Sequence, residues 1–160
     1  MNSPSKTWES RVLIRFPDCD PFNHLNNARY IDYFINARED HIMANMGLNI
    51  YQYAAQKGTG WVVAKNQVAY IKPAFLMETV VVDSTILRLG EKDLVVEMKM
   101  WNEKKDKLKA VLWSQFVHID MKTQKPVSHT GELMDTFRPF ENPLPEQVNF
   151  DERVETLRNL

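Results

Sequence analysis

The stretch Phe16–Tyr30 has the sequence FPDCDPFNHLNNARY, and the interpretation of the whole chain starts from it. Its two prolines, Pro17 and Pro21, interrupt regular structure because proline lacks an amide hydrogen and has a fixed φ angle. Its polar residues crowd into the same short stretch: Asp18, Asp20, Asn23, His24, Asn26 and Asn27. The pattern predicts a polar turn between a strand that ends at Phe16 and a helix that starts near Asn27.

This turn is expected to place a carboxylate beside the start of a helix. Asn26 is a candidate N-cap, since its side-chain oxygen can accept a hydrogen bond from a free amide of the first turn. The free amides and the dipole at a helix N-terminus stabilise negative charge. Acyl-transfer hydrolysis needs both a base and an oxyanion pocket. The residues alone therefore indicate a candidate hydrolytic site.

The residues after the turn predict one long helix over 27–43. Its apolar residues recur near helical spacing and occupy a wide face, which favours a helix covered on most sides. Gly47 is a natural stop for this helix. The sequence of residues 48–58 is ambiguous and fits either a loop or a short helix.

Five segments of this chain predict strands, at 11–16, 61–71, 79–89, 94–101 and 108–119. Short polar links at 90–92 and 102–107 favour antiparallel neighbours. A loose arm at residues 1–9, a turn at 120–127, a helical turn at 130–136 and a charged tail from Arg138 complete the chain. The order predicts an α+β fold in which one curved antiparallel sheet wraps the long central helix.

Length and composition narrow the classes of protein to consider. The chain of 160 residues predicts a single domain over 1–160, with 20 Lys plus Arg against 21 Asp plus Glu. This balance argues against general nucleic-acid binding. No apolar run is long enough for a membrane span, and the N-terminus MNSPSKTWES lacks a signal core. The single Cys19 excludes an internal disulfide, so a cytoplasmic protein is expected.

The chain resembles the hotdog-fold acyl-CoA thioesterases of the 4-hydroxybenzoyl-CoA thioesterase-like family. Three segments carry the resemblance: Asp18-Cys19-Asp20-Pro21, His24-Leu25-Asn26-Asn27 with Tyr30 and Tyr33 after it, and Tyr70-Ile71-Lys72-Pro73-Ala74. The element order over about residues 10–127 also matches, which leaves 128–160 as a peripheral C-terminal segment. The resemblance implies a hotdog fold, an acyl-CoA substrate and no cofactor or metal.

The resemblance also implies roles for individual residues. Asp20 matches the catalytic carboxylate, and the amides near Asn27 match those that polarise the thioester carbonyl. The position of His24 implies substrate orientation or loop packing. The family often has glycine where this chain has Asn23, and asparagine tolerates a positive φ angle better than most residues.

Each candidate residue also has a structural alternative. Asp20 could cap a turn, and Asp18 is expected to accept backbone hydrogen bonds within the loop. Asn26 and Asn27 could be helix caps or could orient the substrate together with His24. Cys19 lies between two acids that would raise the pKa of its thiol, which argues against a cysteine nucleophile.

The function expected from the sequence is hydrolysis of an acyl-CoA to a carboxylic acid and CoA, with Asp20 as general base or as nucleophile. Three alternatives stay open: an acyl carrier protein thioesterase, a non-catalytic module that binds acyl-CoA, and a dehydratase of the same fold. A single sheet would leave edges and an outer face uncovered. The resemblance implies dimers that pair into tetramers, so a homodimer or homotetramer is expected.

Overall fold

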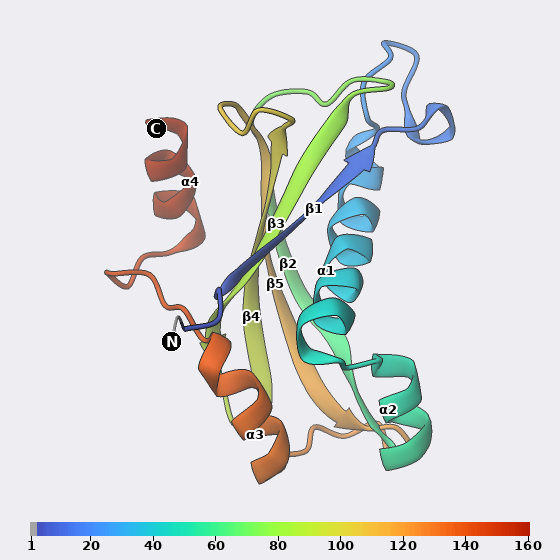
Figure 1. Ribbon diagram of the computed structural model, residues 1–160, viewed down its shortest axis with the longest axis vertical. Coiled ribbons are helices and arrows are strands. Elements are labelled where there is room, and N and C mark those ends of the chain that lie inside the picture. Colours follow the sequence, from blue (N-terminus) through green and yellow to red (C-terminus); the bar gives the residue numbers. More distant parts are fainter. Residues whose placement is uncertain (1–2) are drawn as a thin grey trace.

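The computed structural model describes residues 3–160, and its elements follow the expected order (Figure 1). The strands are β1 (Thr7–Leu13), β2 (Thr59–Tyr70), β3 (Thr79–Leu89), β4 (Asp93–Asn102) and β5 (Leu108–Asp120). The α-helices are α1 (Tyr30–Met46), α2 (Ile50–Lys57), α3 (Gly131–Phe137) and α4 (Phe150–Arg158). The predicted α+β class, with a long central helix against an antiparallel sheet, is confirmed.

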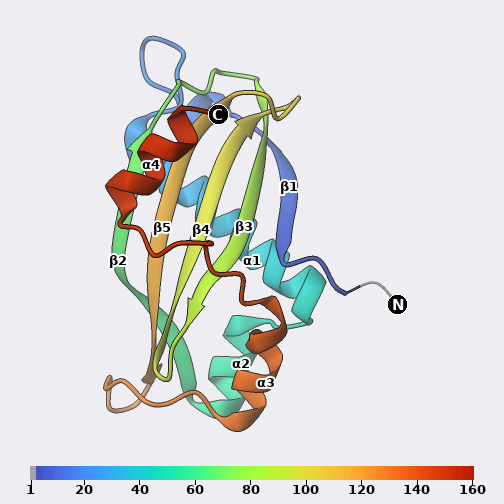
Figure 2. The same cartoon turned by 90° about the vertical axis from the view of Figure 1, so that its left-hand side faces the viewer.

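The five strands form one sheet in the order β1-β3-β4-β5-β2, and every neighbouring pair is antiparallel. The register shifts at three places: in β2 between Val63 and Lys65, in β3 between Ile86 and Arg88, and in β5 opposite Met100 and Trp101 of β4. Such irregularities bend strands and increase their twist. The sheet curves around α1, which lies against one of its faces, while α4 lies on the other (Figures 1 and 2).

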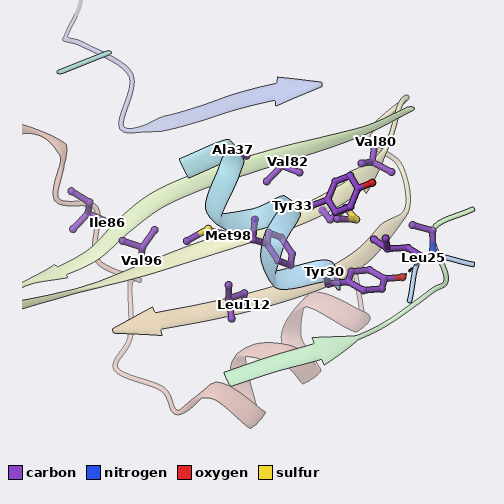
Figure 3. Close-up of a cluster of buried hydrophobic side chains, with 14 of the residues drawn as sticks. Leu25, Tyr30, Tyr33, Ala37, Val80, Val82, Ile86, Val96, Met98 and Leu112 are labelled. Carbon is purple, nitrogen blue, oxygen red and sulfur yellow. Dashed lines mark hydrogen bonds between the residues drawn. The ribbon is translucent and has the colours of Figure 1, made fainter. Parts of the chain in front are cut away.

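The main core fills the space between α1 and the sheet (Figure 3). Alternate residues of β3 face α1, because successive side chains of a strand point to opposite sides. Val80, Val82 and Ile86 of this strand are at most 1% exposed, and the helix contributes the equally buried Phe34. The central helix is therefore buried along its sheet-facing side, whereas Asp32, Asn36 and Asp40 on its other side are exposed. The expectation of a helix covered on most sides is wrong for the single chain.

The central helix starts and ends at residues with recognisable caps. A 3-10 turn at Asn27–Arg29 precedes α1, and the side chain of Asn26 caps that turn. Gly47 ends α1 in the left-handed conformation, with φ of 61°. The helix thus runs three residues beyond the predicted end at residue 43. No helix within residues 3–160 is both long enough and apolar enough to cross a membrane.

The position predicted for the first strand is wrong. It was expected at 11–16 after a loose arm, but β1 spans Thr7–Leu13 and pairs with Thr79–Thr85 of β3. Phe16 instead starts a 3-10 turn whose second residue is Pro17. Trp8 extends the strand toward the N-terminus because its ring is buried against Phe140. Residues 1 and 2 of the expected arm lie outside the described residues.

The C-terminal segment forms a helix that sequence analysis did not predict. Three residues of α4, Phe150, Val154 and Leu157, pack against Leu108 and Val111 of β5 in a second buried cluster. The helix lies on the sheet face opposite α1 (Figure 2). The expectation of an uncovered outer face is therefore wrong where α4 lies. The edges of the sheet are β1 and β2.

Candidate active site

The turn before the central helix is closed by backbone hydrogen bonds on both sides of Asn23. The amide of Asp20 donates to the carbonyl of His24 at 2.8 Å, and the amide of Asn23 donates to the carbonyl of Asp20 at 3.0 Å. Asn23 has a φ angle of 62°, in the left-handed region that asparagine tolerates. The chain therefore forms this turn without glycine.

The two oxygens of the Asp20 carboxylate have different surroundings. Oδ1 accepts hydrogen bonds from the backbone amides of Phe22, at 2.9 Å, and His24, at 3.1 Å. These two bonds fix the orientation of the carboxylate. Within residues 3–160, no group donates a hydrogen bond to Oδ2. One oxygen is therefore held by the loop, and the other is available to a water molecule or a substrate.

The turn is also attached to the segment that follows β2. The amide of Leu25 donates to the carbonyl of Ala74 at 2.8 Å, and the amide of Leu76 donates to the carbonyl of Asn23 at 2.9 Å. The ring of His24 packs edge-to-face on Phe75, with centroids 5.1 Å apart. Two segments about fifty residues apart in sequence thus form one rigid unit around Asp20.

A cleft of about 300 Å³ opens beside this unit. Asp20, His24 and Asn27 line it together, so three of the four predicted site residues come into one cleft. The end of β2 and the residues after it supply much of the remaining wall. The other lining residues are Leu25, Tyr30, Tyr70, Ile71, Lys72 and Pro73.

The start of the helix separates the roles of Asn26 and Asn27. The side-chain oxygen of Asn26 accepts from the amide of Ala28 at 2.9 Å, so this residue is a cap and does not line the cleft. The carbonyl of Asn27 accepts from the hydroxyl of Tyr70 at 2.9 Å. In the described part of the chain, the amide of Asn27 donates no hydrogen bond. That amide is available to developing negative charge.

The hydrogen bonds expected for Asp18 are wrong. Its Oδ2 accepts from the hydroxyl of Tyr33 at 2.6 Å, and the loop amides bond to Asp20 instead. Burial first, and then this carboxylate, raise the pKa of Tyr33 to about 12. Asp18 thus ties the turn to α1, and it lies outside the lining of the cleft that holds Asp20.

Cys19 has the electrostatic setting of an unreactive thiol. Burial, followed by the charges of Asp18 and Asp20, raises its pKa above the usual value. A thiol needs a lowered pKa to be a good nucleophile near neutral pH. Among residues 3–160, no three His, Cys, Asp or Glu side chains are grouped so that they could hold a metal ion.

Sequence analysis assigned no site role to the tyrosines and the lysine of the cleft. The hydroxyl of Tyr30 accepts from the amide of Ala74 at 3.1 Å, and burial is the main cause that raises its pKa. Its phenol therefore keeps its proton at neutral pH. Lys72 lies exposed at the cleft, one residue before Pro73. The motif Tyr70–Ala74 was noticed in the sequence, but its distance along the chain hid its position beside Asp20.

A long helix held in the curve of an antiparallel sheet, with an acidic turn at its N-terminus, defines the class of hotdog-fold thioesterases. The chain belongs to the thioesterase-like superfamily, whose family model matches residues 14–137. The long-chain acyl-CoA thioesterase FadM of Escherichia coli K12 is 27% identical over 127 residues, which is 79% of this chain and 94% of FadM.

Two solved structures show the same arrangement. YbaW, a probable thioesterase from Escherichia coli, has a TM-score of 0.71 and 26% identity, over 84% of this chain and 98% of YbaW. The DHNA-CoA thioesterase of Staphylococcus aureus has a TM-score of 0.75 and 20% identity, over 96% of this chain and 93% of that chain. The second likeness concerns the fold alone.

Proposed function

We propose that this protein is an acyl-CoA thioesterase, which uses water to hydrolyse acyl-CoA to a carboxylic acid and free CoA. One observation carries the proposal: the Asp20 carboxylate has one oxygen fixed by two amides and the other unbonded within residues 3–160, in a cleft that Asn27 also lines. The name of the relative FadM, a long-chain acyl-CoA thioesterase, supports a CoA thioester as substrate.

Asp20 acts on the attacking group. As a general base, its Oδ2 takes a proton from a water molecule that attacks the thioester carbon. As a nucleophile, the same oxygen attacks the carbon, expels the CoA thiolate and forms an anhydride that water then hydrolyses. Both routes need a carboxylate that is held in orientation and has one unbonded oxygen. The hydrogen bonds to Oδ1 supply that orientation.

The start of the central helix stabilises the oxyanion. The amide of Asn27 and the dipole of the helix would meet negative charge on the former carbonyl oxygen. The hydroxyl of Tyr70 donates to the carbonyl of the same residue at 2.9 Å, which ties the backbone of Asn27 to the end of β2. His24 lines the same cleft, where its packing on Phe75 fits a role in orienting the substrate. Losing one oxyanion donor typically raises a barrier by about 2.7–4 kcal/mol.

The remaining parts of the substrate are assigned by charge and by the family resemblance. Lys72 is the exposed cation of the cleft, and its ammonium group would meet the phosphates of CoA. The edge strand β2 exposes Val62 and Val63, with 42% and 46% of their surface accessible. This apolar edge supports a homodimer or homotetramer, with the acyl group in a slot between protomers.

Release of free thiol from a panel of acyl-CoAs of increasing chain length, aromatic acyl-CoAs and acyl carrier protein thioesters tests the proposal. Turnover of an acyl-CoA that Cys19→Ala retains and Asp20→Asn loses is the expected result. If only the carrier-protein thioesters are hydrolysed, the substrate is carried by acyl carrier protein and not by CoA. Tight acyl-CoA binding without turnover would make the protein a binding module.

A further inference from the structure

A second cavity is lined by residues of α1, α2 and α3 and by strands of the sheet. Figure 1 shows that α2 and α3 lie at the end of α1 opposite to the turn that precedes this helix. It has a volume of about 260 Å³. Its walls are mostly apolar and come from both helices and strands, including Ile35, Ile42, Leu48, Leu94, Phe116 and Phe137, and two charged residues, Arg38 and Glu39, also line it. A cavity of this size and character is suited to an aliphatic chain.

One wall of the cavity carries a buried cation, Arg38, which is only 4% exposed. Its Nη1 donates to the hydroxyl of Ser84 at 3.1 Å, and its guanidinium lies 5.4 Å from the ring centre of Trp8. In the described part of the chain, Nε and Nη2 donate to no acceptor. A guanidinium has five N–H donors, so most of its hydrogen-bonding capacity is unused.

The charge of Arg38 is not balanced by a neighbouring carboxylate. No Asp or Glu oxygen of residues 3–160 forms an ion pair with it, and the lining residue Glu39 instead accepts from Tyr51 at 2.6 Å. Burial lowers the pKa of Arg38 to about 10, which leaves it protonated at neutral pH. Its Nε and Nη2 are not among the fully enclosed polar atoms of the described residues, so they remain accessible to a small ligand. A charge largely withdrawn from water gains free energy when an opposite charge pairs with it. The cavity is the space from which an anion could pair with it.

The neighbouring histidine does not change this charge balance. His41 contacts the hydroxyl of Ser84 through Nδ1 at 2.7 Å and that of Ser10 through Nε2 at 3.0 Å. Burial, and then the charge of Arg38, lower the pKa of His41 to about 4. The hydroxyl of Ser84, which also contacts the neutral His41, bonds to the guanidinium without neutralising it.

We propose that this cavity binds a medium-chain fatty acid, with its carboxylate on the guanidinium of Arg38 and its tail between α1 and the sheet. The choice of ligand follows from the unpaired cation and the apolar walls, and it does not depend on the reaction at Asp20. At about 30 Å³ for each small group, the volume of 260 Å³ holds roughly eight methylene-sized units. Octanoate is therefore the probe.

Calorimetric titration of the full chain with octanoate, octan-1-ol and octylammonium tests this site. Octanoate is expected to bind best, because only its headgroup pairs with Arg38. Arg38→Met should weaken octanoate about tenfold to a hundredfold, the usual range for a charge-assisted hydrogen bond, and leave octan-1-ol unchanged. The matched control Arg158→Met removes an exposed arginine of α4 and should change neither.

A second variant keeps the experiment decisive if Arg38→Met does not fold. Ile42→Trp fills the cavity from α1 and leaves the guanidinium in place, so it should abolish binding of both octanoate and octan-1-ol. Equal affinity of the wild type for octanoate and octan-1-ol would overturn the proposal. Unchanged octanoate binding by Arg38→Met or by Ile42→Trp would overturn it as well. Thiol release from acyl-CoA, measured in parallel, reports separately on Asp20.

Discussion

Replacing Arg153 by methionine should weaken the attachment of α4 to the outer face of the sheet. Arg153 donates to both oxygens of Glu97 on β4, at 2.8 and 2.9 Å. Trp113 donates to the same carboxylate at 2.8 Å. Glu97 is 1% exposed, so this ion pair is shielded from solvent on its acidic side. Methionine keeps the apolar part of the side chain and removes the charge.

The size of the stability loss depends on the interactions that Glu97 retains in the variant. Removing one partner of a buried ion pair usually costs about 3–5 kcal/mol. Glu97 retains the indole of Trp113 and the ammonium of Lys99, 3.8 Å away, and 18% of the Arg153 side chain is exposed. We therefore expect a loss of about 2–3 kcal/mol, which corresponds to a Tm roughly 5–10 °C lower for a chain of this length.

The loss should depend on pH. Burial alone would raise the pKa of Glu97, but the hydrogen bonds from Arg153 and Trp113 outweigh it and lower the pKa below its usual value. In the wild type, this carboxylate therefore stabilises the fold above about pH 4.3, its unfolded pKa, and loses that contribution as the pH falls through the folded pKa. In Arg153→Met, burial dominates and the folded pKa rises. The folded variant then takes up a proton more readily, so its deficit should shrink between pH 7 and pH 5.

Thermal unfolding of wild type, Arg153→Met and the control Arg158→Met at pH 7 and pH 5 measures both effects. Arg158 is an exposed residue in the last turn of the same helix, so its variant should unfold like the wild type at both pH values. A Tm of Arg153→Met within about 1 °C of wild type at pH 7 would refute the reasoning, as would a deficit that grows toward pH 5.

Three further outcomes are expected. Asp18→Asn should lower the Tm because it weakens the bond from Tyr33, and it should cost less turnover than Asp20→Asn; a larger kinetic loss for Asp18→Asn would reverse the two roles. Light scattering of an active sample should give a multiple of the 18.8 kDa chain mass, and a monomer mass at micromolar concentration would contradict the proposed assembly. Hydrolysis should survive treatment with a strong chelator followed by its removal; activity that returns only with zinc or manganese would make Asp20 and His24 metal ligands.

Hydrophobic patterning predicted most of the sheet and the central helix. The strand predicted at 79–89 matches β3 at both ends. A short apolar segment bounded by turn residues is typical of a buried strand. The first strand was misplaced because Trp8, the residue that extends it toward the N-terminus, is buried by Phe140 from the distant tail. Helix α4 was missed because three apolar residues among many charges give a weak periodic signal. Its stabilisation comes from contacts with β5 and from the ion pair with Glu97.

The candidate site was predicted only where it is local in sequence. Asp20, His24 and Asn27 belong to one turn, so their proximity follows from the sequence. The distribution of hydrogen bonds between Asp18 and Asp20 depends on the position of Tyr33 on α1, which the sequence does not give. The approach of Tyr70 to this turn depends on the pairing of the sheet.

The measurement that tests the central claim most directly is the turnover of Asp20→Asn with the best acyl-CoA substrate. Asparagine keeps the shape of the side chain and an oxygen for the amides of Phe22 and His24, but it cannot act as a base. A loss of at least about a hundredfold in kcat is expected, with a Tm close to wild type. An Asp20→Asn enzyme that folds normally and turns over at the wild-type rate would contradict the account.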